Sequence, residues 1–419
     1  RNAIADSSLM LVGSEGEGVL FFNPLEEEIY SPTWTLGEIS PFGQLKSSKI
    51  HALLNDKQGN LWLGLYMRGL FMIPKSTYGF RPVNLYANND SANGGVCVTS
   101  ILRSQNGELW VGSDGGGLYL ISGNNKILNF SKHNSQLTNN SIMAMVEDKR
   151  GTIWIATYLG GLYTLAAGQK QIVPYSKLHD MKLSCLAYDK LQDILYVGSL
   201  GNGVKAISLS TNEIISITEE DTPFWTFTLY LNGVGDLWMG TAYGLYYYDN
   251  AIKKMQEINM PKRELKTQIN ACCQRGDTLW VGTNRGLIRY DVKNGQGKRY
   301  TRSDGLPCDV IETLQKTPAG DVWIGTLNGL SCLTPSTGLF KNYYSQDGLQ
   351  SNEFRFGATF VDKNGDLYFG GNNGFTVFNP RRVNSYELPV LEPFFTRLTV
   401  LNETIKFNSE SSILDAPIY

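Results

Sequence analysis

The chain has little histidine, little net charge and no long apolar run. It contains three histidines, His51, His133 and His179, so a catalytic or metal site built on histidine has little material. The net charge of −2 is spread without blocks, which argues against a nucleic-acid surface because that needs concentrated basic residues. No apolar stretch reaches the roughly 18 residues of a membrane span. Because the sequence begins at Arg1, with no signal peptide, we expect a piece of a longer chain.

Cysteine is also sparse, and its spacing excludes a common kind of site. The six cysteines form no C-x-x-C pair, which argues against a structural zinc site. Cys97, Cys185, Cys272 and Cys273 lie in apolar, strand-like runs, so we interpret them as small buried hydrophobic residues. We therefore predict neither a metal nor a cofactor.

What the chain has in quantity is glycine, 44 residues, within a recurring phrase. The phrase reads LWVGTNRGLIRYD at 279–291, with copies such as LWVGSDGGGLYLI, TIWIATYLGGLYTL, DLWMGTAYGLYYYD and DVWIGTLNGLSCL. After the first interval its anchor aromatics recur every 42 to 48 residues. That period, with short alternating strands between glycine turns, is typical of a β-propeller with four strands per blade. The anchors are Trp62, Trp110, Trp154, Tyr196, Trp238, Trp280, Trp323 and Tyr368.

The glycines of this phrase are better interpreted as turns than as a nucleotide loop. A phosphate loop needs the N-terminus of a following helix, and here a strand follows. We predict that Gly282, Thr283 and Gly286 shape a turn, and that Gly151 takes a positive φ in a hairpin. The stretch DKNGD at 362–366 resembles a calcium loop faintly. Other copies hold DKQGN, SQNGE and DKRGT there, which favours a hairpin turn.

The repeats divide into unequal groups. We count nine units, and predict a complete seven-bladed ring over residues 81–384, with its copies between about Val96 and Pro380. Residues 1–80 would be the last two blades of a truncated N-terminal propeller, joined to the ring by a connector over 72–97 that is rich in Pro, Asn and Gly. Residues 385–419 would begin an immunoglobulin-like β domain, with two strands joined by Asn402-Glu403. The fold class is all-β.

The units resemble the two-component regulator propeller repeat, whose core phrase is LWVGT-x-x-GL. The last copy, DGLQSNEFRFGATFVDKNGDLYFGGNNGFTVFNP, and the junction LGLYMRGLFMIPKSTYGFR are similar to the sensor half of hybrid two-component systems of Bacteroides-type gut bacteria. The tail resembles the start of their triple-tyrosine domain. The resemblance implies a periplasmic sensor with two seven-bladed propellers. A membrane helix, a histidine kinase, a receiver and a DNA-binding domain would follow in the full protein.

The same resemblance implies what the sensor does. It implies detection of a glycan-derived oligosaccharide or sugar, and control of polysaccharide-utilisation genes. It also implies a homodimer in the full-length sensor, no nucleic acid bound through this region, and membrane contact only through a missing C-terminal segment. The fragment itself is predicted to bind without catalysis.

Ligand-binding candidates follow from the geometry of a propeller. Function collects at one mouth of the channel, lined by the loops that enter each innermost strand and by the turns between second and third strands. Trp and Tyr stack on sugar faces, while Asn and Arg hydrogen-bond hydroxyls or carboxylates. Asn in a turn is also common for backbone reasons alone, and exposed Tyr or Arg can simply pack on a loop or face solvent. The candidates are Asp114, Tyr158, Asn202, Tyr243, Arg285, Asn328 and Asn373 in turns, and Trp225 and Arg355 at strand starts.

Two alternative functions use the same fold. A propeller-fold glycoside hydrolase needs two facing carboxylates, and the mouth offers Asp114, with Asp304 and Asp347 in entering loops. A propeller-fold polysaccharide lyase needs a base such as His133 or His179. A protein-interaction scaffold is the third possibility, although the blade phrase ending in Trp-Asp that such rings often use is absent.

Overall fold

The computed structural model describes most of the chain and divides it into two compact units. The units are residues 1–384 and 385–419. The described residues are 10–24, 27–30, 45, 48–56, 60–73, 79–85, 95–122, 127–218, 224–260, 265–384, 399–400 and 403–404.

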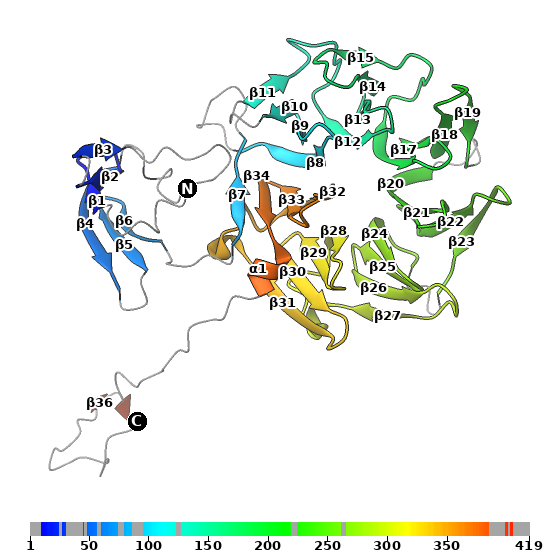
Figure 1. The fold of residues 1–419 in the computed structure, drawn as a ribbon. Helices are drawn as coiled ribbons and strands as arrows, with labels where there is room; N and C mark the ends of the chain where they lie inside the picture. Colours follow the sequence, from blue (N-terminus) through cyan, green and yellow to red (C-terminus); the bar gives the residue numbers. More distant parts are fainter. Residues whose placement is uncertain are drawn as a thin grey trace. The chain divides into compact units, whose positions relative to one another are not determined.

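Within the first unit, seven antiparallel four-stranded blades, numbered 1 to 7 in chain order, are arranged around a common centre (Figure 1). Blades 3 and 4 are joined through β17 and β20 into one eight-stranded sheet. The innermost strands are β8 (Cys97–Arg103), β12 (Ile142–Glu147), β16 (Leu183–Asp189), β20 (Phe224–Leu231), β24 (Ile269–Arg275), β28 (Ile311–Lys316) and β32 (Phe354–Val361). The second strands are β9 (Leu109–Asp114), β13 (Ile153–Thr157), β17 (Ile194–Gly201), β21 (Leu237–Thr241), β25 (Thr278–Thr283), β29 (Val322–Thr326) and β33 (Leu367–Gly371).

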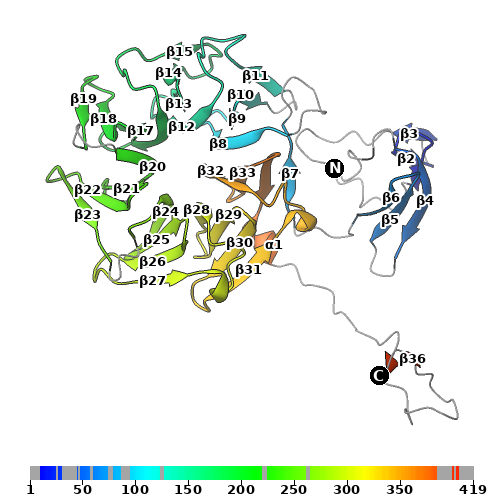
Figure 2. The ribbon, with the colours of Figure 1, turned by 180° about the vertical axis from the view of Figure 1, so that it is seen from behind.

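The outer half of each blade is equally regular. The third strands are β10 (Gly117–Ile121), β14 (Gly161–Leu165), β18 (Val204–Ser208), β22 (Leu245–Asp249), β26 (Gly286–Asp291), β30 (Gly329–Thr334) and β34 (Gly374–Phe378). The outermost strands are β11 (Ile127–Phe130), β15 (Ile172–Pro174), β19 (Ile214–Ser216), β23 (Lys254–Ile258), β27 (Gly297–Tyr300), β31 (Leu339–Tyr343) and β7 (Arg81–Val83). Each innermost strand contacts its two neighbours, and β32 contacts β8, so the ring is closed (Figure 2). The predicted all-β propeller is confirmed.

The seventh blade takes its outermost strand from a distant part of the sequence. β34 pairs antiparallel with β7, with Phe375 opposite Val83 and Val377 opposite Arg81. Residues 81–83, which the sequence suggested as part of a connector, are therefore a strand of the ring. Pro82 is tolerated there because an outermost strand has one edge without a ladder partner.

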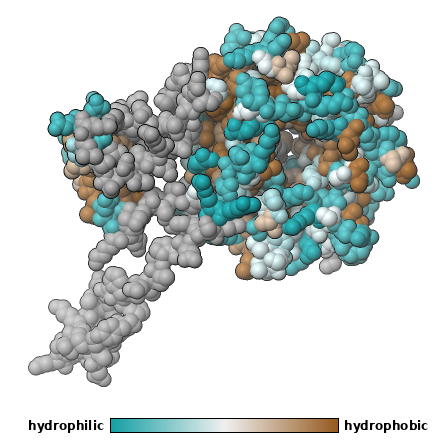
Figure 3. Space-filling model, in the orientation of Figure 1, coloured by the Kyte–Doolittle hydropathy of each residue, from teal (hydrophilic) through white to brown (hydrophobic). Residues whose placement is uncertain are grey.

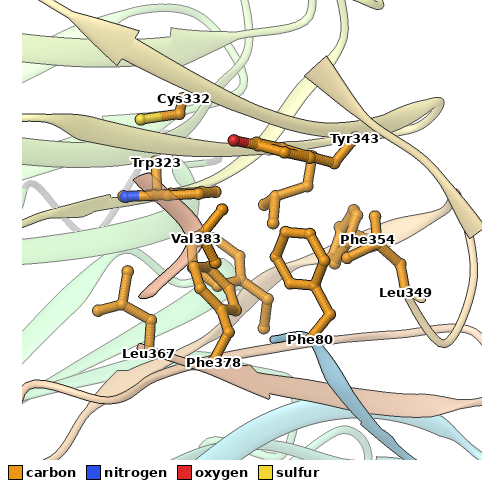
Figure 4. Close-up of a cluster of buried hydrophobic side chains, with 11 residues drawn as sticks. Phe80, Trp323, Cys332, Tyr343, Leu349, Phe354, Leu367, Phe378 and Val383 are labelled. Atoms are coloured by element: carbon orange, nitrogen blue, oxygen red, sulfur yellow. The ribbon is translucent and has the colours of Figure 1, made fainter. Parts of the chain in front are cut away.

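A buried aromatic cluster holds this closure in place (Figure 4). Phe80, immediately before β7, packs edge-on against Tyr343 at 5.1 Å and against Phe378 at 4.9 Å between ring centroids. Val383 belongs to the same cluster and comes from the short helix α1 (Pro380–Asn384) that follows β34. Edge-on aromatic pairs contribute about 0.5–1.5 kcal/mol each beyond the area that they bury. The segments that lead into and out of the ring thus share one core.

The recurring phrase separates into residues with three different roles. Trp280 is 4% exposed and packs between blades, as do the anchors Trp110 and Trp154. The hydroxyl of Thr283 accepts the N–H of Arg285 and donates to the carbonyl of Gly286 at 2.8 Å, which fixes the turn. The same hydroxyl-to-glycine bond occurs in six of the seven blades, at Ser113, Thr157, Ser199, Thr241, Thr283 and Thr326.

The first glycine of the phrase has a role that the sequence interpretation missed. Gly286 has φ of +114° and is a turn residue, as predicted, but Gly282 lies inside β25. A methyl group on Gly282 would sit 2.7 Å from Cγ2 of Ile311, the first residue of the next innermost strand. The equivalent Gly112 stands at 2.6 Å from Ile142 in the same way. Gly282 therefore permits close packing between blades, and the prediction that it shapes the turn is wrong.

Two smaller sheets precede the ring in sequence. They contain β1 (Met10–Gly13), β2 (Val19–Asn23) and β3 (Glu28–Tyr30), then β4 (Ile50–Asn55), β5 (Leu61–Leu65) and β6 (Gly69–Ile73). The two sheets share a buried core, and Gly13 approaches Ile50 of the next sheet as Gly112 approaches Ile142 in the ring. This contact is what two consecutive propeller blades would make. That these blades end a truncated propeller stays a prediction.

The second unit is described only at one short hairpin. β35 (Thr399–Val400) pairs antiparallel with β36 (Glu403–Thr404), and Val400 lies opposite Glu403. Glu403 is thus a strand residue, whereas the sequence suggested it for the turn. Most of residues 385–419, and with them the predicted immunoglobulin-like domain, lie outside the described residues. Among the helices that are described, none has the length and apolar character of a membrane span.

Candidate ligand-binding site

One face of the ring carries both kinds of segment that the sequence analysis singled out. Because the strands of a blade alternate in direction, the turns between second and third strands lie on the same side as the loops that enter the innermost strands. We call this side the mouth face, and the opposite side, with the turns between first and second and between third and fourth strands, the far face. Backbone hydrogen bonds connect turn and strand start within a blade, as from Tyr158 N–H to the Ser141 carbonyl at 2.9 Å.

Blade 4 presents two exposed aromatic side chains on the mouth face. Trp225 is 46% exposed at the start of β20, and Tyr243 is 59% exposed in the turn between β21 and β22. Ala242 N–H donates to the Trp225 carbonyl at 2.9 Å, so the two aromatic residues are held close together in the backbone. A methyl group on Gly201 of the preceding blade would lie 4.0 Å from the Trp225 indole nitrogen. Blade 4 therefore offers a fixed aromatic surface.

Neighbouring blades are linked on the mouth face where candidate residues meet. Asp114 of blade 1 accepts a hydrogen bond from the Ser141 hydroxyl of blade 2 at 2.7 Å. Tyr158 of blade 2, 36% exposed, forms an isolated antiparallel bridge with Lys182 of blade 3. Trp225 pairs in the same way with Leu200 of blade 3. Asp114 and Tyr158 thus connect neighbouring blades. These contacts leave other exposed atoms of the two side chains available for ligand binding.

The other turn candidates are exposed but are explained in part by the turn itself. Backbone N–H groups of Asn202, Arg285 and Asn328 donate to the hydroxyl that precedes them in the phrase. Asn373 has φ of +64°, a conformation that Asn tolerates better than most residues, and Gly95 packs directly against it. The surface of the ring seen in Figure 3 is mostly hydrophilic with scattered hydrophobic residues. The aromatic pair of blade 4 is therefore the more distinctive feature.

Every innermost strand of the ring carries a β-bulge near its start, and these bulges connect the blades around the channel. The register shifts fall at equivalent places, for example between Leu183 and Cys185. The bulged residue often bonds to the next blade. Ser184 donates to the Thr226 carbonyl at 2.6 Å, and Asn270 donates to the Ile311 carbonyl at 2.9 Å. Bulges frequently aim side chains towards functional sites.

The bulge of blade 7 is longer and displaces one predicted site residue. Its register shift spans Phe354 to Thr359, whereas other blades skip a single residue. Counting back from the anchor Tyr368 with the spacing of the other blades therefore reaches Arg355, but the equivalent strand-start residue is Glu353. The backbone confirms this, because Asn372 N–H donates to the Glu353 carbonyl at 3.1 Å. The prediction that Arg355 occupies the strand-start position is wrong by two residues.

The displaced Arg355 lies in a partly buried cluster instead. Its guanidinium lies 5.0 Å from the Phe356 ring centroid, and its Nε has no hydrogen-bond partner among the described residues. Burial raises the pKa of Glu312, which is 7% exposed, and the positive charge of Arg355 opposes that rise. Burial also raises the pKa of Cys97, again opposed by Arg355. The cluster joins blades 6, 7 and 1.

The long bulge also reaches blades across the ring. Phe356 packs edge-on against Phe227 of blade 4, with ring centroids 5.9 Å apart, and β32 contacts both β20 and β24. Phe356 N–H donates to the Glu312 carboxylate at 3.1 Å. The bulge of blade 7 therefore narrows the channel and connects the Arg355 cluster to the blade that carries Trp225 and Tyr243.

Comparison with known families assigns two of the repeats, one before the ring and one in blade 2. Residues 44–66 and 136–159 match the family model of the two component regulator propeller. These two segments of the chain carry the two-component regulator propeller repeat. A comparison with curated protein sequences gave no match.

Solved structures share the propeller fold of this chain. The extracellular domain of a putative hybrid two component system from B. thetaiotaomicron matches with a TM-score of 0.75 and 22% identity, over 96% of this chain and 55% of that one. This chain thus spans about half the length of that structure. Virginiamycin B lyase from Staphylococcus aureus matches with a TM-score of 0.57 and 13% identity, over 71% of this chain and 97% of the lyase. At these identities the likeness shows the propeller fold alone.

The carboxylates that an enzyme would need have structural partners in this regulator propeller. Asp304 and Asp347 each accept the backbone N–H of a residue three positions earlier, at 2.8 Å, and so cap short 3-10 helices, η6 (Arg302–Asp304) and η7 (Ser345–Asp347). His133 and His179 are exposed. In the described part of the chain, no three His, Cys, Asp or Glu side chains gather as metal ligands. Burial raises the pKa of Cys185 and Cys273 to about 12, so these thiols stay protonated.

Proposed function

We propose that this chain is part of the ligand-sensing region of a two-component sensor, and that it binds a glycan-derived oligosaccharide or sugar at the mouth face. The observation that carries the proposal is the exposed pair of Trp225 and Tyr243 on a ring in which blade 2 matches the two-component regulator propeller repeat. In the other blades the equivalent strand starts hold no aromatic residue; they are Cys97, Ser141, Lys182, Gln268, Val310 and Glu353. An asymmetric aromatic surface on a symmetric frame is what selective recognition requires.

The chemistry of the mouth face suits a sugar. Exposed indole and phenol rings stack on the C–H faces of sugar rings, and such contacts contribute about 0.5–1.5 kcal/mol beyond buried area. Polar residues stand at the equivalent strand starts of two other blades, Lys182 in blade 3, bridged to Tyr158, and Glu353 in blade 7, before the long bulge. Arg355 adds a cation with an unpartnered Nε. A sugar that carries a carboxylate would therefore find a counter-charge in this region.

The wider role is inferred from the kind of repeat. We infer a periplasmic location in an inner-membrane protein, with the fragment joined in its parent to a histidine kinase that acts as a homodimer. Ligand binding would then regulate polysaccharide-utilisation genes. The regulator propeller repeats and the fold likeness to an extracellular sensor domain support this inference.

Calorimetric titration of the complete two-propeller ectodomain with a panel of oligosaccharides tests the proposal. At least one glycan should release heat, and Trp225→Ala and Tyr243→Ala should each weaken binding about 3- to 10-fold, as expected for losing one stacking contact. Ile215→Ala is the matched control, since Ile215 is 54% exposed on the outermost strand β19, away from the mouth face. No heat with any glycan, or an affinity in both aromatic variants equal to that of the unmodified protein, would contradict the proposal.

A further inference from the structure

The far face of the ring contains a pocket between blades 1 and 2 that belongs to none of the candidate sites above. Its volume is about 440 Å³, within the range of about 300–1,000 Å³ that small-molecule sites occupy. The walls are the turn that joins β8 to β9, the turn that joins β12 to β13, and the turn after β14. These turns are on the opposite side of the blades from Trp225 and Tyr243.

The unpaired indole in the floor of the pocket can be traced to one residue. In blade 2 the indole nitrogen of Trp154 donates to Asp148 at 3.1 Å, and Trp62 donates to Asp56 at 2.9 Å in the same way. The equivalent position in blade 1 is Ser104, whose backbone N–H makes the same turn hydrogen bond, to Glu108, that Asp148 makes to Thr152. A serine side chain is too short to repeat the bond to the indole of Trp110.

In blade 1 the indole of Trp110 therefore lacks the hydrogen-bond acceptor that Asp148 provides in blade 2. Trp110 lines the pocket, is 1% exposed, and its Nε1 has no hydrogen-bond partner. A buried donor without an acceptor costs about 1–3 kcal/mol, so an acceptor oxygen supplied from the pocket would be stabilising. Ile153 and Leu165 complete an apolar floor around the indole.

The rim of the pocket is polar but balanced in charge. Glu147 accepts the Gln105 N–H through both carboxylate oxygens, at 3.1 and 2.8 Å, and keeps further acceptor capacity. Lys149 and Arg150 are already paired with Asp193, at 3.1 and 2.9 Å. The cations of the rim are thus occupied, and a carboxylate stands inside, so an anionic ligand is disfavoured. An uncharged molecule with several hydroxyl groups fits the apolar floor and the mixed donors and acceptors of the rim.

We propose that this far-face pocket is a second binding site, separate from the mouth face, for a neutral sugar of one or two rings. A ring hydroxyl would accept the hydrogen bond from Trp110, and other hydroxyls would donate to the Glu147 carboxylate. The apolar face of the sugar would lie over Ile153 and Leu165. The site does not depend on the function proposed for the mouth face.

Saturation-transfer NMR of this chain with glucose, galactose, mannose, maltose and lactose tests the site. Two variants fill the pocket, Ser104→Asp, which supplies the indole with the acceptor found in blade 2, and Ala167→Trp, which adds bulk at an exposed position of the rim. At least one sugar should bind the unmodified chain, and both variants should weaken it at least 10-fold. The matched control is Thr317→Asp, the same change at the equivalent turn of blade 6, where the Trp323 indole also lacks a partner.

The outcomes separate this site from the mouth face. Binding that survives Trp225→Ala and Thr317→Asp but is lost in the two filled variants supports the pocket. Three results would overturn it, namely no binding of any of the five sugars, binding unaffected by both filled variants, or binding lost only in Trp225→Ala. The unfolding midpoint of each variant shows that lost binding does not come from a lost fold.

Discussion

The two faces of the ring present their aromatic side chains in opposite ways. The mouth face exposes aromatic side chains, Trp225 and Tyr243, on a surface shaped by turns. The far face hides its indole, Trp110 at 1% exposure, beneath a pocket with a polar rim. Trp225 stands where the strand starts of the other blades hold no aromatic residue, and Ser104 stands where blades 2 and 7 have Asp148 and Asp362. In a repeat protein, function is therefore best sought where one copy differs.

The largest expected effect separates a tryptophan buried between blades, Trp110, from one exposed on the mouth face, Trp225. Trp110→Ala should lower the free energy of unfolding by about 3–5 kcal/mol, because it leaves a cavity between blades 1 and 2. Trp225→Ala removes a side chain that is 46% exposed and should cost about 1 kcal/mol or less. Urea denaturation of both variants measures the contrast. Similar losses in the two variants would mean that Trp225 is also part of the frame.

The close packing of adjacent blades should not tolerate an added methyl group at Gly282. Gly282→Ala places a methyl group 2.7 Å from Ile311 and should destabilise the ring by about 1–3 kcal/mol. Gly233, in a far-face turn, has no atom within 4 Å of the added methyl and does not have a positive φ. Gly233→Ala should change the free energy of unfolding by no more than about 0.5 kcal/mol. Equal effects of the two changes would argue against the inter-blade role of Gly282.

A smaller effect is expected from repairing the floor of the far-face pocket. Ser104→Asp should raise the free energy of unfolding by about 1 kcal/mol, since it satisfies the Trp110 indole as Asp148 satisfies that of Trp154. Thermal denaturation in about 0.15 M salt limits the repulsion between the new carboxylate and its acidic neighbours. A crystal structure of the variant that shows no carboxylate at the Trp110 nitrogen would contradict this account.

The smallest effect concerns the channel, and it depends on pH. Burial raises the pKa of Glu312 in the folded state above its usual value, so the folded protein favours the protonated form. Ionisation of Glu312 therefore destabilises the folded state. This destabilisation is absent below the pKa of Glu312 in the unfolded state and fully present above its raised pKa in the folded state. Glu312→Gln, which keeps an acceptor for Phe356 N–H, should therefore raise the unfolding midpoint at pH 7 and have no such effect near pH 4. A gain that is equal at both pH values would contradict the burial argument.

Much of the frame was predictable because one local rule repeats. The 42- to 48-residue period predicted the ring, and the alternation of apolar and polar residues predicted the strands. Gly151 takes the positive φ of +78° that was predicted for its hairpin. Cys185, Cys272 and Cys273 are buried, as their apolar neighbours indicated, whereas Cys97 is only partly buried. Each of these features is determined by residues close together in sequence, and each can be checked against several copies.

Features that depend on distant residues or on the length of a bulge were beyond the sequence. Counting back from the anchor aromatic located Trp225 but failed at Arg355. The bulge of blade 7 contains two more residues than the other bulges, and the composition of that stretch does not indicate them. Strand β7 has three residues and a proline, too short a signal without its partner β34. The substitution of Ser104 for aspartate is visible in the sequence, but only the structure shows the pocket and the unpaired indole that follow from it.

The closure of the ring by β7 also has a mechanical consequence. Arg81, where the chain enters, lies opposite Val377, near where it leaves, so the two ends of the ring depart from the same end of one antiparallel pair. Tension between the segments before and after the ring would load this pair by unzipping, one hydrogen bond at a time, rather than by shearing all of its bonds together. Blade 7 would then unfold before the other blades, and the packing of Phe80 against Tyr343 and Phe378 would oppose that unfolding.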